Sequence, residues 1–219
     1  MSMVFSAILL GHYRSKPQSY HVLWWLIGVL TYGAGTLTES LNTVVGWSET
    51  NFRWWYITGA LLGGAPLAQG TVYLTVPKRW AHALTALLVA YVFVASVFVW
   101  LSPIDLSLVN EMRMSGSCFD WQWVRKFSPF VNLYAVAFLV GGALFSAYKY
   151  FKSQGSSTRF YGNLLIAVGA ILPGIGGSFT RFGYVEVLYV TEFLGLACIW
   201  VAYRMMRNDS SESIHDVQR

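Results

Sequence analysis

The chain has 219 residues, of which 55% are hydrophobic and 11% are charged. A soluble domain carries about 25% charged residues, so this composition excludes an ordinary water-soluble fold and predicts a polytopic membrane protein. The formal net charge of +5 does not indicate a nucleic-acid partner, because the Lys and Arg residues of a membrane protein collect in cytoplasmic loops. The lipid bilayer is therefore the first partner that we expect.

The N-terminal stretch MSMVFSAILLG is apolar, but it is too short to cross a hydrocarbon core of about 30 Å. It lacks the basic start and the small-residue cleavage site of a signal peptide. We expect it either to belong to a short seventh helix or to lie along the membrane interface.

Six longer apolar stretches predict an all-α fold, a polytopic bundle of transmembrane helices. They cover residues 20–38, 54–76, 80–101, 130–148, 160–179 and 183–203. We expect residues 1–207 to form a single transmembrane domain. Residues 208–219 are polar and without apolar periodicity, so they are expected to form a disordered cytoplasmic tail.

The distribution of basic residues predicts the orientation. Ten of the fifteen Lys and Arg residues lie on the side of the membrane that holds residues 12–19 and the C-terminus. The positive-inside rule places that side in the cytoplasm, and a bacterial inner membrane is the setting that we expect. Tryptophans near both ends of the spans, such as Trp54, Trp100 and Trp80, are typical of the aromatic belts at the two interfaces.

Glycines and prolines fall inside two of the spans. Gly59 and Gly63 have four-residue spacing in the second span, and small residues at such spacing let helices pack closely in lipid. Gly162, Gly169 and Gly176 are seven residues apart in the fifth span and share one face. Because proline removes a backbone donor, we expect a kink or a break in each span. The candidate residues are Pro66, Pro173, Gly174, Gly176 and Gly177.

The second and fifth spans are also the middle members of two sets of three. Each opens with an arginine and aromatic residues, RWWY and RFYG, and has a proline 13 or 14 residues later. Interrupted helices at matching positions of inverted halves indicate a transporter site. Ordinary glycine contact faces are the alternative.

Acidic residues in the apolar segments suggest where a site lies. Glu192 lies about 14 Å below the outer boundary at 1.5 Å per residue, close to the middle of the membrane. There a carboxylate must be protonated, be paired or face water; the alternative is a protonated acid hydrogen-bonded to a neighbouring helix. Polar residues of the outer half and of the second span complete the candidate ligand or proton pathway. They are Glu186, Tyr189, Arg181, Asn132, Gln69 and Glu39.

The sequence contains no familiar catalytic or metal-binding pattern. His12, His21, His82 and His215 have no paired metal-ligand spacing, and interfacial positions explain His21 and His82 better than haem ligation. Every lysine flanks a span or lies in a loop, which excludes a retinal Schiff base. We expect no cofactor, no metal and no enzymatic activity.

Two stretches carry a resemblance. GALLGGAPLAQGTVYLTVPKR and GAILPGIGGSFTRFGYVEVLYVTEFLG resemble a family of uncharacterised bacterial integral membrane proteins with about seven spans. The resemblance covers most of the six stretches and implies a longer first helix. It implies no activity and no site residues.

The leading hypothesis is a transporter of a small molecule or an ion, or a related solute-binding membrane protein, with an outward-facing polar pocket around Glu192. The alternative is a membrane sensor or partner subunit that binds another protein or a lipid, as a homo-oligomer or with a membrane partner protein. An enzyme acting on a lipid-soluble substrate ranks last, because no catalytic set is recognisable.

Overall fold

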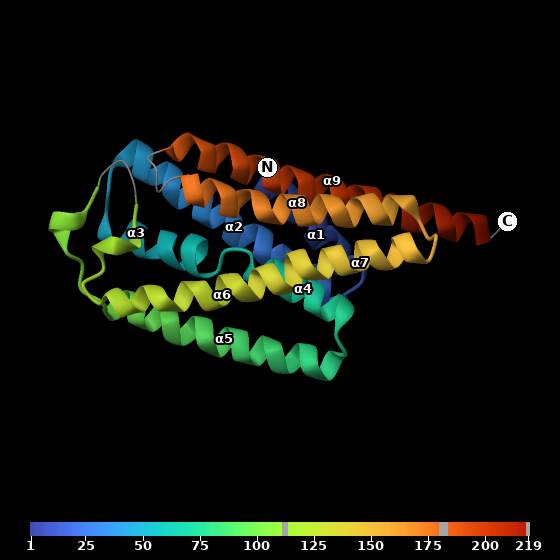
Figure 1. Cartoon of the computed structure of the whole chain (residues 1–219), viewed down its shortest axis with the longest axis horizontal. Helices are drawn as coiled ribbons and strands as arrows, with labels where there is room; N and C mark the ends of the chain where they lie inside the picture. The colour runs from blue at the N-terminus through green and yellow to red at the C-terminus, as the bar shows by residue number, and fades with distance from the viewer. Residues whose placement is uncertain (111–113, 180–183, 218–219) are drawn as a thin grey trace. The chain divides into compact units, whose positions relative to one another are not determined.

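The computed structural model of the protein describes residues 1–110, 114–179 and 184–217. Every regular element in these residues is a helix (Figure 1), so the predicted all-α class is confirmed. Four of the described helical stretches are long and apolar enough to cross a membrane, which supports membrane association. They are Lys78–Leu101, Gln122–Lys152, Ser157–Phe179 and Glu186–Asp209.

The other two predicted spans, 20–38 and 54–76, are helical but are not among these four. The first is α2, Tyr20–Val45, whose Trp, Tyr, Gly and Thr residues make it less apolar than the other spans. The second consists of three pieces: α3 (Glu49–Trp55), the π-helix η1 (Tyr56–Leu61) and α4 (Ala65–Thr75). A total of six or seven crossings therefore remains a prediction.

Contacts divide the chain into two compact units, Met1–Ala135 and Val136–Arg219, and each is described by itself. The boundary falls inside one helical stretch made of α6 (Phe127–Ala135), the π-helix η5 (Val136–Val140) and α7 (Gly141–Lys152). The single domain over residues 1–207 stays a prediction.

Helix α4 is the central helix of unit 1. All residues from Ala65 to Val72 are buried, and a helix that is buried all round must be surrounded by other helices. It contacts α2, α5 (Lys78–Leu101) and α6. By contrast, α5 buries only Ala81, Leu88, Ala95 and Val99, a narrow stripe whose spacing leaves the other faces for lipid.

The N-terminal helix α1, Ser2–Ser15, packs against α2 and buries Phe5 and Leu9. Its 14 residues extend about 21 Å, less than the hydrocarbon thickness. The structure thus makes residues 1–11 part of a short helix that cannot cross a membrane upright.

The described residues of the longest predicted outer loop, 102–110 and 114–126, form a folded structure. Three short 3₁₀-helices lie in this described part of the loop: η2 (Leu106–Leu108), η3 (Gly116–Cys118) and η4 (Gln122–Lys126). Its side chains join those of α3, η1 and α5 in one apolar cluster, so the loop packs over the ends of these helices. The buried members are Phe52, Tyr56, Ile57, Val99, Cys118, Phe119 and Val124.

Unit 2 is built around two long helices, α8 (Ser157–Phe179) and α9 (Val185–Val217), which lie side by side (Figure 1). The predicted glycine face of α8 meets α9. A Cβ on Gly169 would lie 2.6 Å from the carbonyl oxygen of Gly195, and one on Gly176 would lie 2.0 Å from Thr191 Oγ1. Only glycine allows the two backbones to approach this closely.

Two features of unit 2 bear on the sequence-based expectations. Helix α8 continues through Pro173 without a break. A kink at this position, the other half of the prediction, is compatible with a continuous helix. Helix α9 continues to Val217, into the segment 208–219 that we expected to be disordered. Helix extension costs little once a helix exists, and Asp209 is held by an ion pair with Arg159 at 3.0 Å.

Candidate functional site

The second helical stretch is interrupted near the middle of its length. We call α3, η1, residues 62–64 and α4 together the interrupted helix. The N–H of Leu62 donates to the carbonyl of Ile57 at 2.9 Å, which closes the last π-helical turn. Gly63 then has φ +43°, a left-handed conformation that glycine adopts without strain. Pro66 lies in the first turn of α4, where its missing N–H is tolerated.

Asn132, a predicted site residue, lies at this interruption. Its Oδ1 atom is 3.1 Å from the position that a Cβ on Gly63 would occupy, and the carbonyl oxygen of Gly59 is 3.4 Å from the same position. A main-chain oxygen and a side-chain oxygen therefore approach the non-helical residues from two elements, η1 and α6.

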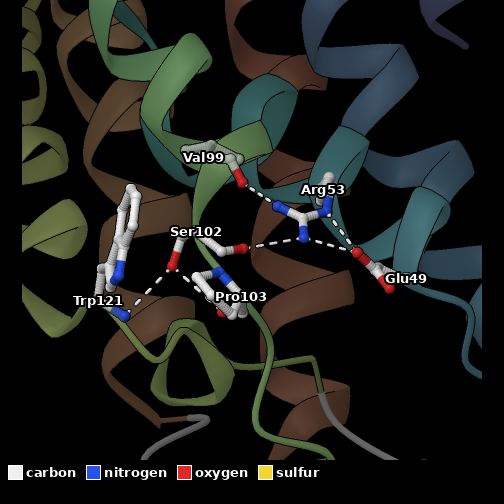
Figure 2. Close-up of polar contacts among 6 residues, drawn as sticks. All are labelled: Glu49, Arg53, Val99, Ser102, Pro103 and Trp121. Carbon is white, nitrogen blue, oxygen red and sulfur yellow. Dashed lines mark hydrogen bonds and ion pairs between the residues drawn. The ribbon is translucent and has the colours of Figure 1, made fainter.

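A buried arginine fixes the N-terminal part of the interrupted helix. Figure 2 shows the guanidinium of Arg53 between the carboxylate of Glu49 and the end of α5. It donates to Glu49 Oε1 from Nη2 at 2.6 Å and from Nε at 3.1 Å. It also donates to the carbonyls of Ser102, at 2.9 Å, and Val99. A cation at a helix C-terminus satisfies the last carbonyls and interacts favourably with the helix dipole, so Arg53 ties α3 to α5.

The loop with η2, η3 and η4 is attached to the same junction. The backbone N–H of Trp121 donates to Ser102 Oγ at 3.2 Å, and Ser102 Oγ in turn donates to the carbonyl of Pro103 (Figure 2). Ser102 is fully buried. The fold at the end of α5 thus holds both the interrupted helix and the loop in place.

Glu39 lies on α2 beside the N-terminal half of the interrupted helix. The indole N–H of Trp55 donates to its Oε1 atom at 2.8 Å. Its other carboxyl oxygen, Oε2, is buried, and no described residue hydrogen-bonds to it. One turn deeper, Gly35 packs against the backbone of Gly59, with its Cβ position 3.3 Å from Gly59 Cα. Glu39 is therefore a half-buried acid next to a tight helix contact.

Gln69 lies in the C-terminal half of the interrupted helix and is fully buried. Its Nε2 donates to the carbonyl of Ala81 at 3.1 Å and to Thr85 Oγ1 at 2.7 Å. Its Oε1 accepts from the hydroxyl of Tyr134. Both N–H groups of the amide are thus used within the protein, and Gln69 joins α4 to α5 and α6.

The polar chain continues towards the predicted cytoplasmic end. The hydroxyl of Tyr73 lies 3.0 Å from Thr85 Oγ1 and 2.9 Å from His82 Nδ1. Tyr20 of α2 stacks on Tyr73 with ring centroids 5.5 Å apart. Five polar side chains, from Tyr134 to the exposed His82, are therefore connected by hydrogen bonds across three helices.

The remaining candidate residues lie in unit 2. Glu192 is half-buried in α9, while Glu186 and Tyr189 are exposed. Arg181 lies outside the described residues, so its predicted pairing with Glu186 stays a prediction. Within unit 1 the structure brings Asn132 to the interruption but places Glu39 and Gln69 in separate hydrogen-bonded groups.

Sequence reasoning missed several residues of this site. Arg53 carried a signal, because it opens a span next to tryptophans, but nothing in the sequence indicates that it is buried at the end of α5. Thr85 and Tyr134 have no such signal in the sequence, since threonine and tyrosine are common in membrane helices. Their roles depend on which helices pack together.

No family model, curated protein or solved structure matches the chain. We therefore infer function from the geometry of the chain itself.

Proposed function

We propose that the protein is a multi-pass membrane transporter of a small molecule or an ion, with its site at the interrupted helix. The four apolar helices support membrane association. In the proposal, α2 and the interrupted helix complete six crossings. Helix α2, with 26 residues, extends about 39 Å, enough to cross, and the interrupted helix packs among α2, α5 and α6.

The orientation that we propose follows the basic residues. The positive-inside rule places the C-terminus in the cytoplasm and the chain in the cell membrane, as in a bacterial inner membrane. In this arrangement α1 lies along the cytoplasmic interface, and the loop with η2, η3 and η4 lies outside. The junction at Arg53 then lies at the outer boundary, and His82 at the inner boundary.

The single observation that carries the proposal is the interruption at residues 62–64 in the most buried helical stretch of unit 1. Backbone groups in hydrocarbon must be hydrogen-bonded, so non-helical backbone at membrane depth occurs only where protein or a water-filled cavity surrounds it. Interrupted helices of this kind form substrate and ion sites in transporters.

The predicted site residues take roles within this proposal. Asn132 contributes a side-chain oxygen at the interruption, and Gln69 positions α4 against its neighbours. Glu39 and Glu192 are the candidate protonatable groups, with Glu186, Tyr189 and Arg181 nearer the outer boundary. Buried acids in membrane helices often serve in ion paths.

Uptake into proteoliposomes tests the proposal. Vesicles with and without the protein are incubated in a defined mixture of amino acids, sugars, nucleosides and alkali cations, and their contents are quantified by mass spectrometry, while an entrapped dye reports proton flux. We expect one class of solute to accumulate above the protein-free level. Uptake should fall in Pro66→Ala, which favours a continuous helix, but not in Gly174→Ala, where no atom beyond the adjacent backbone of α8 lies within 4 Å of the new methyl position. Equal contents in all vesicles would refute transport.

A further inference from the structure

The end of η1 carries unpaired main-chain oxygens. Helix η1 ends at Leu61, and within the described part of the chain no N–H donates to the carbonyls of residues 58–61. The last four carbonyls of any helix lack intrahelical partners and are normally satisfied by water or by a cap. Here they lie in the middle of the interrupted helix, where Thr58 and Leu61 are buried and Gly59 and Ala60 are half-buried, and a carbonyl left unsatisfied away from water is unfavourable.

Asn132 is a second, independent source of oxygen at the same place. Its Oδ1 faces Gly63, and none of the described residues forms a hydrogen bond with its amide. Its oxygen lies at the turn that the carbonyl of Gly59 also approaches.

The other side of the interruption offers few donors. The N–H of Ala65 donates to the carbonyl of Leu62, and the N–H of Ala68 donates to that of Gly64, both at 2.9 Å. Pro66 has no N–H. Two of the N–H groups at the start of α4 are thus paired and a third is missing, while the side chain at the interruption, that of Asn132, presents an oxygen.

We propose that a monovalent metal cation, Na⁺ or K⁺, binds at the interruption between the carbonyls of residues 58–61 and Asn132 Oδ1. All these oxygens are neutral. Divalent Ca²⁺ and Mg²⁺ are normally bound with the help of carboxylates, whereas rings of neutral carbonyls replace the hydration shell of alkali cations. Carbonyls of unwound helices bind the coupling cation in known transporter folds. The inference rests on the proposed function, since it names the ion that moves or drives movement.

Cation-dependent stability tests the site directly. Thermal unfolding of the purified full chain in mild detergent is followed in NaCl, KCl and choline chloride at constant ionic strength. A ligand that binds only the folded state raises the midpoint in a saturable manner. We expect this for Na⁺ or K⁺ relative to choline, and competition with radioactive ²²Na⁺ gives the affinity. A midpoint that does not depend on the cation, as for a site that holds water only, would overturn the inference.

Two variants at one position sharpen the test. Asn132→Leu removes the side-chain oxygen and should weaken binding at least tenfold, while Asn132→Asp adds a charge and should tighten it. Because Asn132 is exposed, we expect both variants to unfold near the wild-type midpoint in choline. Asn163→Leu is the matched control, since that amide already donates to the carbonyl of Arg159; its affinity should be unchanged. Equal affinities for all four proteins would overturn the site.

The outcomes for cation and transport are separable. Solute uptake that is the same in choline and in Na⁺ or K⁺, without measurable cation binding, would overturn this inference and leave the proposed transport standing. Saturable cation binding in a protein that moves neither solute nor ion would support the site and refute transport.

Discussion

Replacing Gly176 by alanine should separate α8 from α9. The new methyl carbon would lie 2.0 Å from Thr191 Oγ1 and 2.8 Å from Leu188 Cα, which real contacts do not allow. Thr191 cannot easily turn away, because its hydroxyl is hydrogen-bonded to the carbonyls of Val187 at 2.7 Å and Leu188 at 2.9 Å. Either this hydroxyl loses its acceptors or α9 moves outward.

The magnitude follows from these two routes. Overpacking of a tight contact costs about 1–3 kcal/mol, and loss of the threonine hydrogen bond costs about 1 kcal/mol. The better helix propensity of alanine offsets up to about 1 kcal/mol of this loss. We expect a net loss of about 1–3 kcal/mol in the free energy of unfolding, a decrease of several degrees in the unfolding midpoint at about 2–4 °C per kcal/mol.

Thermal unfolding in detergent, followed by size-exclusion chromatography, measures this loss. Gly174→Ala is the matched control in the same helix, since no atom beyond the adjacent backbone of α8 lies within 4 Å of its methyl position; it should be neutral or slightly stabilising. Gly169→Ala should also destabilise, because its methyl would lie 2.6 Å from the carbonyl oxygen of Gly195. One outward movement of α9 relieves both clashes, so the double variant should lose less than the sum of the single losses. Equal midpoints for Gly176→Ala and Gly174→Ala would refute this reasoning.

Other positions give further expectations. Arg53→Met leaves two buried carbonyls of α5 without their donor and should lower the free energy of unfolding by about 2–3 kcal/mol, with a smaller loss for Arg53→Lys, both measured by thermal unfolding. Gln69→Leu removes the partner of Tyr134 and Thr85 and should cost about 2–4 kcal/mol in the same assay. Burial raises the pKa of the Cys118 thiol, so in a Cys198→Ser background a maleimide at pH 8 should react far more slowly with the folded than with the unfolded chain. The folded chain also holds the thiol proton of Cys118 more tightly than the unfolded chain does. The free energy of unfolding should therefore fall as pH rises above the thiol's ordinary pKa of about 8.5. Glu192→Gln should abolish transport without loss of assembly, whereas a purely structural Glu192 predicts that Gln is tolerated and that Glu192→Leu destabilises the bundle.

Long apolar helices were predictable because composition alone defines them. The predicted stretches 80–101 and 160–179 end at the same residues as α5 and α8, since polar or charged residues follow both apolar runs in the sequence. Helix α2 extends beyond its predicted end, to Val45, because polar residues such as Glu39 and Asn42 remain in the helix. Polarity sets the end of an apolar run, but not the end of a helix.

Side-chain partners were not predictable in the same way. Gln69 was recognisable as a polar residue in an apolar run, but its partners Ala81, Thr85 and Tyr134 lie on two other helices. These pairings depend on the rotation of each helix about its axis, which packing decides. The sequence therefore indicated that the Gln69 amide needs hydrogen-bond partners, and only the fold identifies them.

The two prolines show why the same residue type leads to different outcomes. Pro66 follows Gly63, which leaves helical geometry at φ +43°, and the carbonyl of Leu62 accepts instead from Ala65, so the helix stops and restarts. Pro173 deprives the carbonyl of Gly169 of its usual donor, yet α8 continues. A Cβ on Gly195 would lie 2.6 Å from that carbonyl oxygen. Because glycine has only a hydrogen in that direction, α9 can pack this closely against the freed carbonyl. A proline in a membrane helix interrupts it where the preceding residues can leave the helix, and is tolerated here where a glycine of the neighbouring helix leaves room for the freed carbonyl.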